Sequence, residues 1–220
     1  MSKPSAKLEL FASFAAVAKA AANPRRLDLL EHVAQGERSV EDLAVVSGLS
    51  VANASQHLLR LRRGGLVASR RDGKRVLYSL SGVQVLDLLA ALRAIGERHM
   101  AEAHRTIAQY FSKRDALEPL GAPELVRGME AGTILLLDVR PQDEFALGHL
   151  RGAVNVPLAK LARGLKSLPR SKEVVAYCRG PYCVLAFEAV ALLRERGFSA
   201  RRLDGGFPEF AAAGVPTSLQ

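Results

Sequence analysis

Cys178 and Cys183 are the only two cysteines in the chain, and their spacing could support thiol chemistry. Cys178 directly follows Val174-Val175-Ala176-Tyr177, a run typical of a buried strand, and a predicted helix begins near Val184. In a parallel sheet such a loop lies at the carboxyl end of a strand, where ligands bind. Its backbone amides and the helix N-terminus stabilise negative charge, which lowers the pKa of a thiol. The spacing therefore indicates a nucleophilic thiolate at Cys178.

The second thiol offers a further reaction. A thiolate at Cys183 could attack a persulfide on Cys178 and leave a disulfide or a sulfur-bridged pair, which would make the loop a switch. Alternatively, Cys183 is a small, buried and inert residue at the start of the helix. Two cysteines so close together do not form the disulfide framework of a secreted protein but are normal for intracellular thiol chemistry.

Charge is distributed unevenly along the 220 residues, which carry a net +9. Residues 1–114 contain 18 basic and 10 acidic side chains, whereas residues 115–220 contain 13 and 12. Such a basic first half favours a polyanionic partner, either nucleic acid or an anionic membrane surface. No apolar stretch approaches the ~18 residues of a membrane span, and no secretory signal is recognisable. We expect a cytoplasmic protein.

The first half has the pattern of a helix-turn-helix followed by a hairpin. Asn23-Pro24 separates two helices, and Ser39 and Ser50 are predicted helix caps. The helix Val51 to Arg63 has one apolar side and a second side with hydrogen-bonding groups suited to a major groove. After Gly64-Gly65, two alternating runs flank Asp72-Gly73, which is a strong hairpin signal. The basic residues at its tip suit a phosphate backbone.

These features resemble the ArsR family of bacterial winged-helix repressors over residues 11–80. The resemblance is carried by Asn23-Pro24-Arg25-Arg26-Leu27, by Leu49-Ser50 to Gln56-His57-Leu58, by Leu61 to Val67, and by the Arg71-Asp72-Gly73-Lys74 wing. It implies a homodimer that reads a pseudo-palindromic DNA operator. Gln56 and Asn53 are the best candidates for base contacts, because amides can bond adenine bidentately, whereas His57 could pack or contact phosphate. The predicted DNA-binding residues are Ser50, Asn53, Ser55, Gln56, His57, Arg60, Arg70, Arg71, Lys74 and Arg75.

A long helix from about Val83 to Tyr110 is expected to follow the wing. Its apolar stripe, Val85 to Ile95, predicts a dimer interface or an internal core helix, and both can hold. The metal-binding residues of metal-sensing family members are missing here: residues 39–43 contain no cysteine, and Asp87 is followed by Leu89 where a histidine would be needed. We expect no metal and no cofactor.

The second half alternates strands and helices, which indicates a parallel sheet covered on both faces. It resembles the rhodanese family of sulfurtransferases over residues 120–216. The supporting motifs are Leu137-Asp138-Val139-Arg140, Glu144 to Leu158, Tyr177-Cys178-Arg179-Gly180, and Leu203 to Phe210. Among these, Asp138 and Arg140 predict a buried ion pair, and the predicted scaffold also includes His149, Asn155, Gly205 and Gly206.

The rhodanese resemblance implies that Cys178 takes a sulfane sulfur from thiosulfate or a persulfide and passes it on. Arg179 would pair with an anionic donor, and the loop formed by Gly180, Pro181 and Tyr182 would cradle the transferred sulfur with its backbone amides. Two features depart from a plain enzyme, because Pro181 lacks an amide donor and Cys183 supplies a second thiol. A rhodanese-type activity with Cys178, Arg179 and Cys183 as the catalytic residues is therefore expected but open.

The sequence thus predicts two domains: a mainly α winged helix-turn-helix over 1–112 and an α/β rhodanese-like domain over 122–220, with a linker over 113–121. The favoured hypothesis is a dimeric repressor that binds operator double-stranded DNA and senses or relays sulfane sulfur through Cys178 and Cys183. One alternative is an active sulfurtransferase that is tethered to DNA. Another is a dithiol sensor of arsenite or oxidants.

Overall fold

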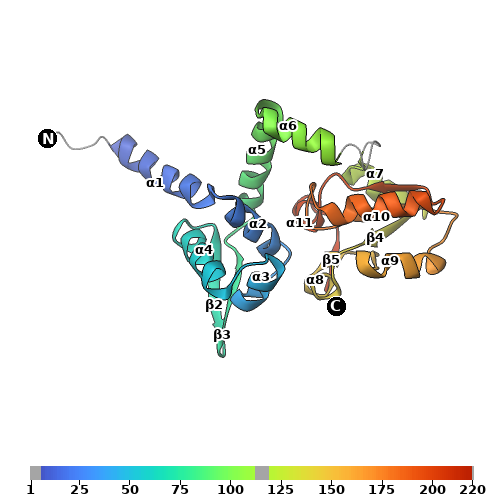
Figure 1. Cartoon of the computed structure of the whole chain (residues 1–220), viewed down its shortest axis with the longest axis horizontal. Coiled ribbons are helices and arrows are strands. Elements are labelled where there is room, and N and C mark those ends of the chain that lie inside the picture. Colours follow the sequence, from blue (N-terminus) through green and yellow to red (C-terminus); the bar gives the residue numbers. More distant parts are fainter. Residues whose placement is uncertain (1–5, 112–118, 220) are drawn as a thin grey trace. The chain divides into compact units, whose positions relative to one another are not determined.

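A computed structural model describes residues 6–111 and 119–219, and the chain forms two compact units, Met1–Leu89 and Ala90–Gln220 (Figure 1). Contacts thus divide the chain at Leu89, earlier than the predicted boundary at residue 112. Most of the predicted linker, residues 113–118, lies outside the described residues.

The first unit is a helical domain with a three-stranded sheet. Its elements are α1 (Ala6–Ala21), α2 (Pro24–Val33), β1 (Arg38–Ser39), α3 (Val40–Val46), α4 (Val51–Arg63), β2 (Val67–Asp72), β3 (Arg75–Leu80) and the beginning of α5 (Gln84–His99). Side-chain caps start three of the helices: Asn23 accepts from the Arg26 amide, Ser39 from the Asp42 amide and Ser50 from the Asn53 amide. Ser39 and Ser50 are the caps that the sequence predicts, and Asn23 lies at the predicted break between two helices.

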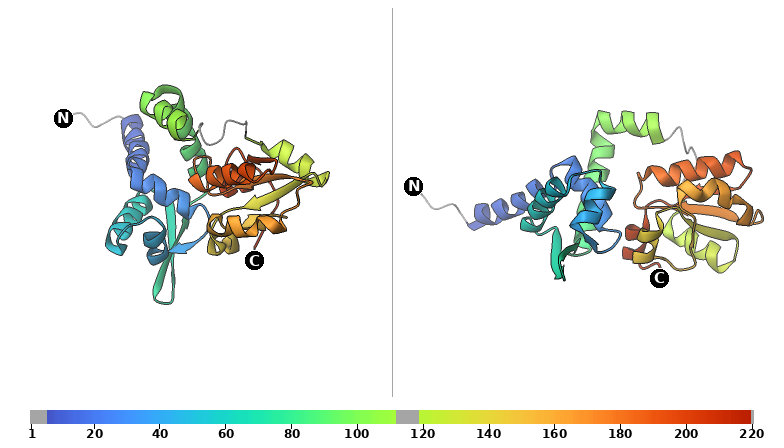
Figure 2. Two further views of the ribbon diagram at one scale, coloured as in Figure 1. Left: turned by 45° about the vertical axis from the view of Figure 1, so that its right-hand side comes forward. Right: turned by 60° about the horizontal axis from the view of Figure 1, so that its bottom comes forward.

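The hairpin of β2 and β3 forms the wing and projects from this unit in both views of Figure 2. Asp72 pairs with Arg75 across its end, and Gly73 has a φ of 58°, which side chains rarely adopt. The base of the wing joins the helices through a core that includes Leu58, Leu61 and Tyr78. The winged helix-turn-helix fold is therefore confirmed.

The expected long helix over residues 83–110 is wrong as a single element. α5 ends at His99, α6 spans Ala101–Thr106, and a π-helix, η1, spans Ile107–Phe111. Met100 separates α5 from α6 with φ −102° and ψ 112°, an extended conformation. No residue of α6 or η1 is buried, so no core packing holds this segment in one straight helix.

The second unit is an α/β domain. From residue 119 onward its elements are α7 (Ala122–Glu130), β4 (Ile134–Asp138), α8 (Gln142–Leu147), β5 (His149–Leu150), β6 (Val154–Asn155), α9 (Leu158–Gly164), a 3-10 helix η2 (Leu165–Ser167), β7 (Glu173–Tyr177), α10 (Val184–Glu195), β8 (Ala200–Arg202), α11 (Phe207–Ala212) and β9 (Thr217–Ser218). The main sheet is parallel with the order β6-β4-β7-β8. β5 and β9 pair separately.

Alternation along the strands builds two hydrophobic layers. Val174 and Ala176 of β7 pack with α9 and α10, whereas Val175 and Tyr177 pack with α7 and α11 on the other face. The parallel, doubly covered sheet confirms the predicted α/β class. It also places the loop after β7, with both cysteines, at the carboxyl edge.

Candidate functional sites

The loop after β7, residues 178–183 and here called the cysteine loop, is closed by a disulfide between Cys178 and Cys183, with a Cα–Cα distance of 6.3 Å. Cys178 is 0% and Cys183 6% exposed, and both belong to the core beneath α10. The Cys183 amide donates to the Gly180 carbonyl at 3.1 Å, and Pro181 has no amide hydrogen. Of the expected sulfur-cradling positions, Pro181 therefore offers no donor to a bound sulfur, and the neighbouring Cys183 amide is already engaged.

Gly205 and Gly206 bring the start of α11 against the cysteine loop. A Cβ on Gly206 would lie 2.2 Å from the Arg179 carbonyl carbon and 2.3 Å from the Gly180 nitrogen, so no side chain fits. Gly205 has a φ of 140°, which side chains rarely adopt. Two residues later, the Phe207 backbone amide donates to the Cys178 carbonyl at 3.0 Å. These contacts fix the backbone at Cys178.

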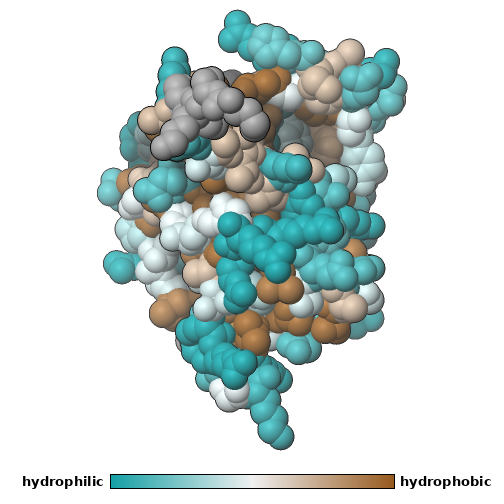
Figure 3. Space-filling model, turned by 90° about the vertical axis from the view of Figure 1, so that its left-hand side faces the viewer, coloured by the Kyte–Doolittle hydropathy of each residue, from teal (hydrophilic) through white to brown (hydrophobic). Residues whose placement is uncertain are grey.

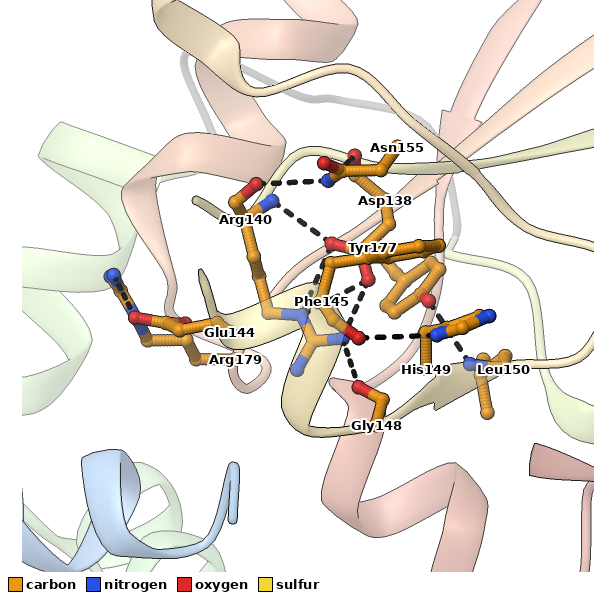
Figure 4. A network of polar contacts seen from close by, with 10 residues as sticks. All are labelled: Asp138, Arg140, Glu144, Phe145, Gly148, His149, Leu150, Asn155, Tyr177 and Arg179. Atoms are coloured by element: carbon orange, nitrogen blue, oxygen red, sulfur yellow. Dashed lines mark hydrogen bonds and ion pairs between the residues drawn. The ribbon is translucent and has the colours of Figure 1, made fainter. Parts of the chain in front are cut away.

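The Arg179 guanidinium is engaged by a carboxylate. Its Nη2 lies 2.7 Å and its Nε 2.9–3.1 Å from the oxygens of Glu144, whose side chain is fully buried on α8 (Figure 4). The sequence analysis assigned Arg179 to an anionic donor and missed this partner. The carboxylate neutralises the guanidinium through two parallel contacts. Because Glu144 belongs to α8 and Arg179 to the cysteine loop, the ion pair also links these two elements.

Asp138 and Arg140 form a second, fully buried ion pair with Nη2–Oδ2 2.6 Å. Arg140 also donates to the Gly148 carbonyl at 2.8 Å, and the Asn155 amide donates to the carbonyls of Asp138 and Arg140 (Figure 4). The guanidinium lies 4.6 Å from the centre of the Phe207 ring. This network ties β4 to β6 at the edge of the sheet.

Tyr177 and His149 complete this scaffold. The Tyr177 hydroxyl accepts from the Leu150 amide at 3.1 Å, and burial together with Asp138 raises its pKa far above the usual range. His149 stacks on Phe145 with ring centres 3.7 Å apart and has Nδ1 3.1 Å from the Phe145 carbonyl. Both side chains thus stabilise the position of β5, and His149 also packs on α8. Tyr177 is neutral at pH 7.

Tyr182 connects the cysteine loop to the helical segment at the start of the second unit. Its ring lies 5.0 Å from that of Phe111, and its hydroxyl is bonded to Glu97. Burial and the Glu97 hydrogen bond raise the pKa of Tyr182 to about 12. Phe111 also packs on Phe187 of α10 at 4.9 Å. Sequence spacing gives no signal for these contacts.

A pocket of about 380 Å³ adjoins Tyr182 and Phe111, lined mostly by α5, α6 and η1. Arg93 on its wall is paired with Glu209 of α11 at 3.0 Å. Two residues of α5 therefore make contacts in this region: Arg93 pairs with α11, and Glu97 bonds Tyr182 of the cysteine loop.

The winged unit presents the predicted DNA-binding residues along α4 and the wing. Ser50, Asn53, Gln56 and Arg60 are exposed, and Ser55 and His57 are half-buried. His57 Nδ1 has no hydrogen-bond partner among the described residues. Burial, followed by the charges of Arg26, Arg60 and Arg25, lowers the pKa of His57, so its ring is neutral at pH 7.

The wing is strongly hydrophilic at its tip (Figure 3). Arg71, Lys74 and Arg75 are exposed and make no ion pair with the described residues. Arg70 differs, because its Nε lies 2.9 Å from both carboxylate oxygens of Glu37, an interaction that raises its pKa. The sequence grouped Arg70 with the other three and missed the carboxylate, which is 33 residues away.

Comparison with known proteins gives the same division of the chain. The model for "Bacterial regulatory protein, arsR family" matches residues 23–69, and the rhodanese-like domain model matches residues 121–213. The HTH-type transcriptional regulator Rv0324 of Mycobacterium tuberculosis is 42% identical over 211 residues, 96% of this chain and 92% of that protein. The chain belongs to the arsR family. It is a transcriptional regulator of that family with a rhodanese-like domain.

Relatives of single parts also occur. A sulfurtransferase of Allochromatium vinosum is 30% identical over 84 residues, 38% of this regulator and 77% of that protein. The homodimeric winged helix-turn-helix domain of Mb0332 from Mycobacterium bovis, known as a fragment, is 40% identical; the match covers 46% of this regulator and 95% of that domain, with a TM-score of 0.42. No described helix is long and apolar enough to span a membrane, and no cluster of three metal-binding side chains occurs among the described residues.

Proposed function

We propose that this regulator is a dimeric, sulfur-responsive repressor in which the Cys178–Cys183 pair is the sensor and the winged helix binds the operator. The observation that carries the proposal is a buried, closed cysteine pair in the rhodanese-like loop of an arsR regulator. The protein is folded when this pair is a disulfide, so the change between the thiol and disulfide forms of the loop can serve as a signal.

The chemistry requires two displacement steps. The Cys178 thiolate attacks the outer sulfur of an organic persulfide, the S–S bond of the donor breaks, and the donor leaves as a thiolate. The Cys183 thiolate then attacks the sulfur of Cys178, and hydrosulfide leaves. The two cysteine sulfurs are oxidised to a disulfide, and the transferred sulfur is reduced to sulfide. A thiol reductant reverses the final state.

Several contacts favour sensing over continuous turnover. The disulfide occupies the Cys178 sulfur, Glu144 neutralises Arg179, and the loop has lost amide donors at Pro181 and Cys183. Each of these weakens a site that must bind an anionic donor and release a sulfur repeatedly. The similarity to the Allochromatium sulfurtransferase supports the rival enzyme hypothesis.

Tyr182 supplies a route for the signal. It lies next to Cys183 in the chain and contacts Phe111 and Glu97, which belong to η1 and α5. Opening or closing the disulfide must move the backbone between the two cysteines, and Tyr182 is part of that backbone. α5 begins at Gln84, and its Val85 is buried in the core of the winged unit. A movement of α5 would therefore reach the DNA-binding unit.

Exposed apolar side chains support dimer formation. On α1, the residues Leu8, Leu10, Phe11 and Phe14 are each more than half exposed, and on α5 Ile95 is 60% exposed. The predicted stripe on α5 is divided, because Val85 is buried in the core whereas Leu92 and Ile95 are exposed. Apolar faces of this extent on helices are typical of subunit interfaces.

The test combines intact mass with DNA binding. The reduced protein is treated with an organic persulfide, and its mass is measured under non-reducing conditions beside its affinity for DNA selected by the protein itself. We expect the wild type to lose two hydrogens and to change affinity 5- to 150-fold, the range of an allosteric coupling of ~1–3 kcal/mol. Cys183→Ser should instead gain one sulfur and keep its affinity.

Other outcomes separate the rivals. An unchanged affinity despite disulfide formation would overturn the sensor, and sustained sulfur transfer by Cys183→Ser would establish the tethered sulfurtransferase. A response to arsenite or peroxide without one to persulfide would establish the dithiol sensor. No mass change in either protein would remove sulfane sulfur as the signal.

A further inference from the structure

A pocket in the winged unit is lined by four cations. It has a volume of about 340 Å³ and is formed by Lys19 and Ala20 of α1, Arg26 of α2, and Arg60, Arg63 and Gly64 at the end of α4. It belongs to the winged unit, whereas the cysteine loop belongs to the second unit, so the inference does not rest on the proposed sulfur chemistry.

The packing of two helices explains why these charges meet. A Cβ on Gly64 would lie 2.2 Å from the Cβ of Ala20, so α1 and the end of α4 touch where both residues are small. This close approach brings the basic last turns of both helices together: Lys19 on α1, and Arg60 and Arg63 on α4.

Arg26 is the fixed element of the pocket. It is 7% exposed, and its Nε and Nη2 donate to the carbonyls of Ala20 and Lys19 at 2.5 and 3.0 Å. Neither Arg26 nor any of the other three cations forms an ion pair with a carboxylate of the described residues. A buried guanidinium without a counter-charge is costly unless an anion joins it.

Helix dipoles do not balance this charge. The C-termini of α1 and α4 each contribute roughly half a negative charge. Four cations therefore leave an excess of about three positive charges around one small pocket. The two helix C-termini thus offset about one of the four positive charges, and the excess of about three is left without a counter-charge from the described residues.

We propose that this pocket binds an oxyanion of the phosphate type. Arg26 would hold the anion from the buried side, and Arg60, Arg63 and Lys19 would close around it. The same chemistry is offered by two sources, a phosphate of the DNA backbone and a free inorganic oxyanion, and the experiment distinguishes them.

The test uses the full chain and two matched variants. Sulfate, inorganic phosphate and thiosulfate are each titrated at constant ionic strength against chloride, and binding is followed by the NMR signals of His57 and the Arg26 Nε group. The double variant Arg60→Gln/Arg63→Gln removes two of the four positive charges that line the pocket. Arg62→Gln is the control, because Arg62 has the same charge on the same helix, bonds Ser69 and does not line the pocket.

If a free oxyanion is the occupant, the wild type and Arg62→Gln should saturate, and the double variant should bind at least about tenfold more weakly, since charge-assisted hydrogen bonds are lost. An anion next to Arg26 and Arg60 should also move the pKa of His57 back upward, because those two charges now lower it. Arg26 itself is left intact, since it caps α1.

If DNA supplies the phosphate, free oxyanions will not saturate the pocket. Instead, the salt dependence of binding to a non-specific duplex should fall by about one unit in the double variant beyond the fall in Arg62→Gln. Absence of both effects, with unchanged thermal unfolding of the variants, would overturn the proposal.

Discussion

The Arg179 guanidinium in the cysteine loop forms a bidentate ion pair with the fully buried Glu144 carboxylate, in which Nε and Nη2 lie 2.7–3.1 Å from the carboxylate oxygens. The residue next to Cys178 is thereby engaged in the scaffold of the domain. Its partner lies 35 residues earlier, on α8, so the pair holds α8 against the cysteine loop.

Removing the arginine should destabilise the second unit strongly. Arg179→Met removes the bidentate ion-pair partner of the buried Glu144 carboxylate, and we expect a loss of about 3 kcal/mol in the free energy of unfolding. Urea unfolding measures it. Glu124→Gln is the control, because Glu124 is 47% exposed in its pair with Arg201 and should cost less than about 1 kcal/mol. Equal effects of the two substitutions would contradict the structural role of Arg179.

Glu97 should be needed to transmit the state of the cysteines. Glu97→Ala removes the hydrogen bond to Tyr182, so persulfide treatment should still form the disulfide, as mass shows, but the change in DNA affinity should shrink at least about threefold. Glu102→Ala is the matched control, because Glu102 lies on the neighbouring helix and pairs only locally with Arg105. A full response in Glu97→Ala would remove Tyr182 from the route.

The raised pKa of Tyr182 predicts an alkaline dependence of stability. An unfolded tyrosine ionises near 10, whereas folded Tyr182 keeps its proton up to about 12. The resulting stability is complete below pH 10 and is lost as the pH rises towards 12. Over this window the free energy of unfolding should fall more steeply in the wild type than in Tyr182→Phe. Parallel curves would contradict the assigned shift.

The basic residues of the wing should not contribute equally to DNA binding, although each carries one positive charge. Arg71→Ala and Lys74→Ala should each lower the slope of log affinity against log salt by about one unit if each contacts a phosphate. Arg70→Ala should lower it less, because Glu37 holds Arg70. Binding to a non-specific duplex over a range of salt concentrations measures all three. Equal slopes for Arg70→Ala and Arg71→Ala would show that the Glu37 pair opens on DNA.

Local signals account for the parts of the fold that the sequence predicts. The caps at Asn23, Ser39 and Ser50 act over three residues, and Asp72-Gly73 sets a two-residue turn, so their spacing can be recognised without a structure. The continuous apolar run from Val174 to Tyr177 similarly predicts a strand buried on both faces.

The sequence could not show pairs that form only when distant segments meet. Glu37 and Arg70 are 33 residues apart and Glu144 and Arg179 are 35 apart, and Glu97 on α5 and Tyr182 in the cysteine loop are farther apart still along the chain. The break at Met100 was missed for a related reason. Helical periodicity records which face is apolar, and it does not register a single extended residue.

The cysteine loop is short, since only five positions separate the bonded residues in sequence. In the chain-entropy description, closing so small a ring restricts the unfolded chain little and is worth only about 2 kcal/mol, near the lower end for disulfides. The bond therefore adds little to the free energy that keeps the rhodanese-like domain folded. Under the proposed function, the pair could therefore be reduced and reoxidised at little cost to the stability of the domain, so the same molecule could report a signal, be reset and report again.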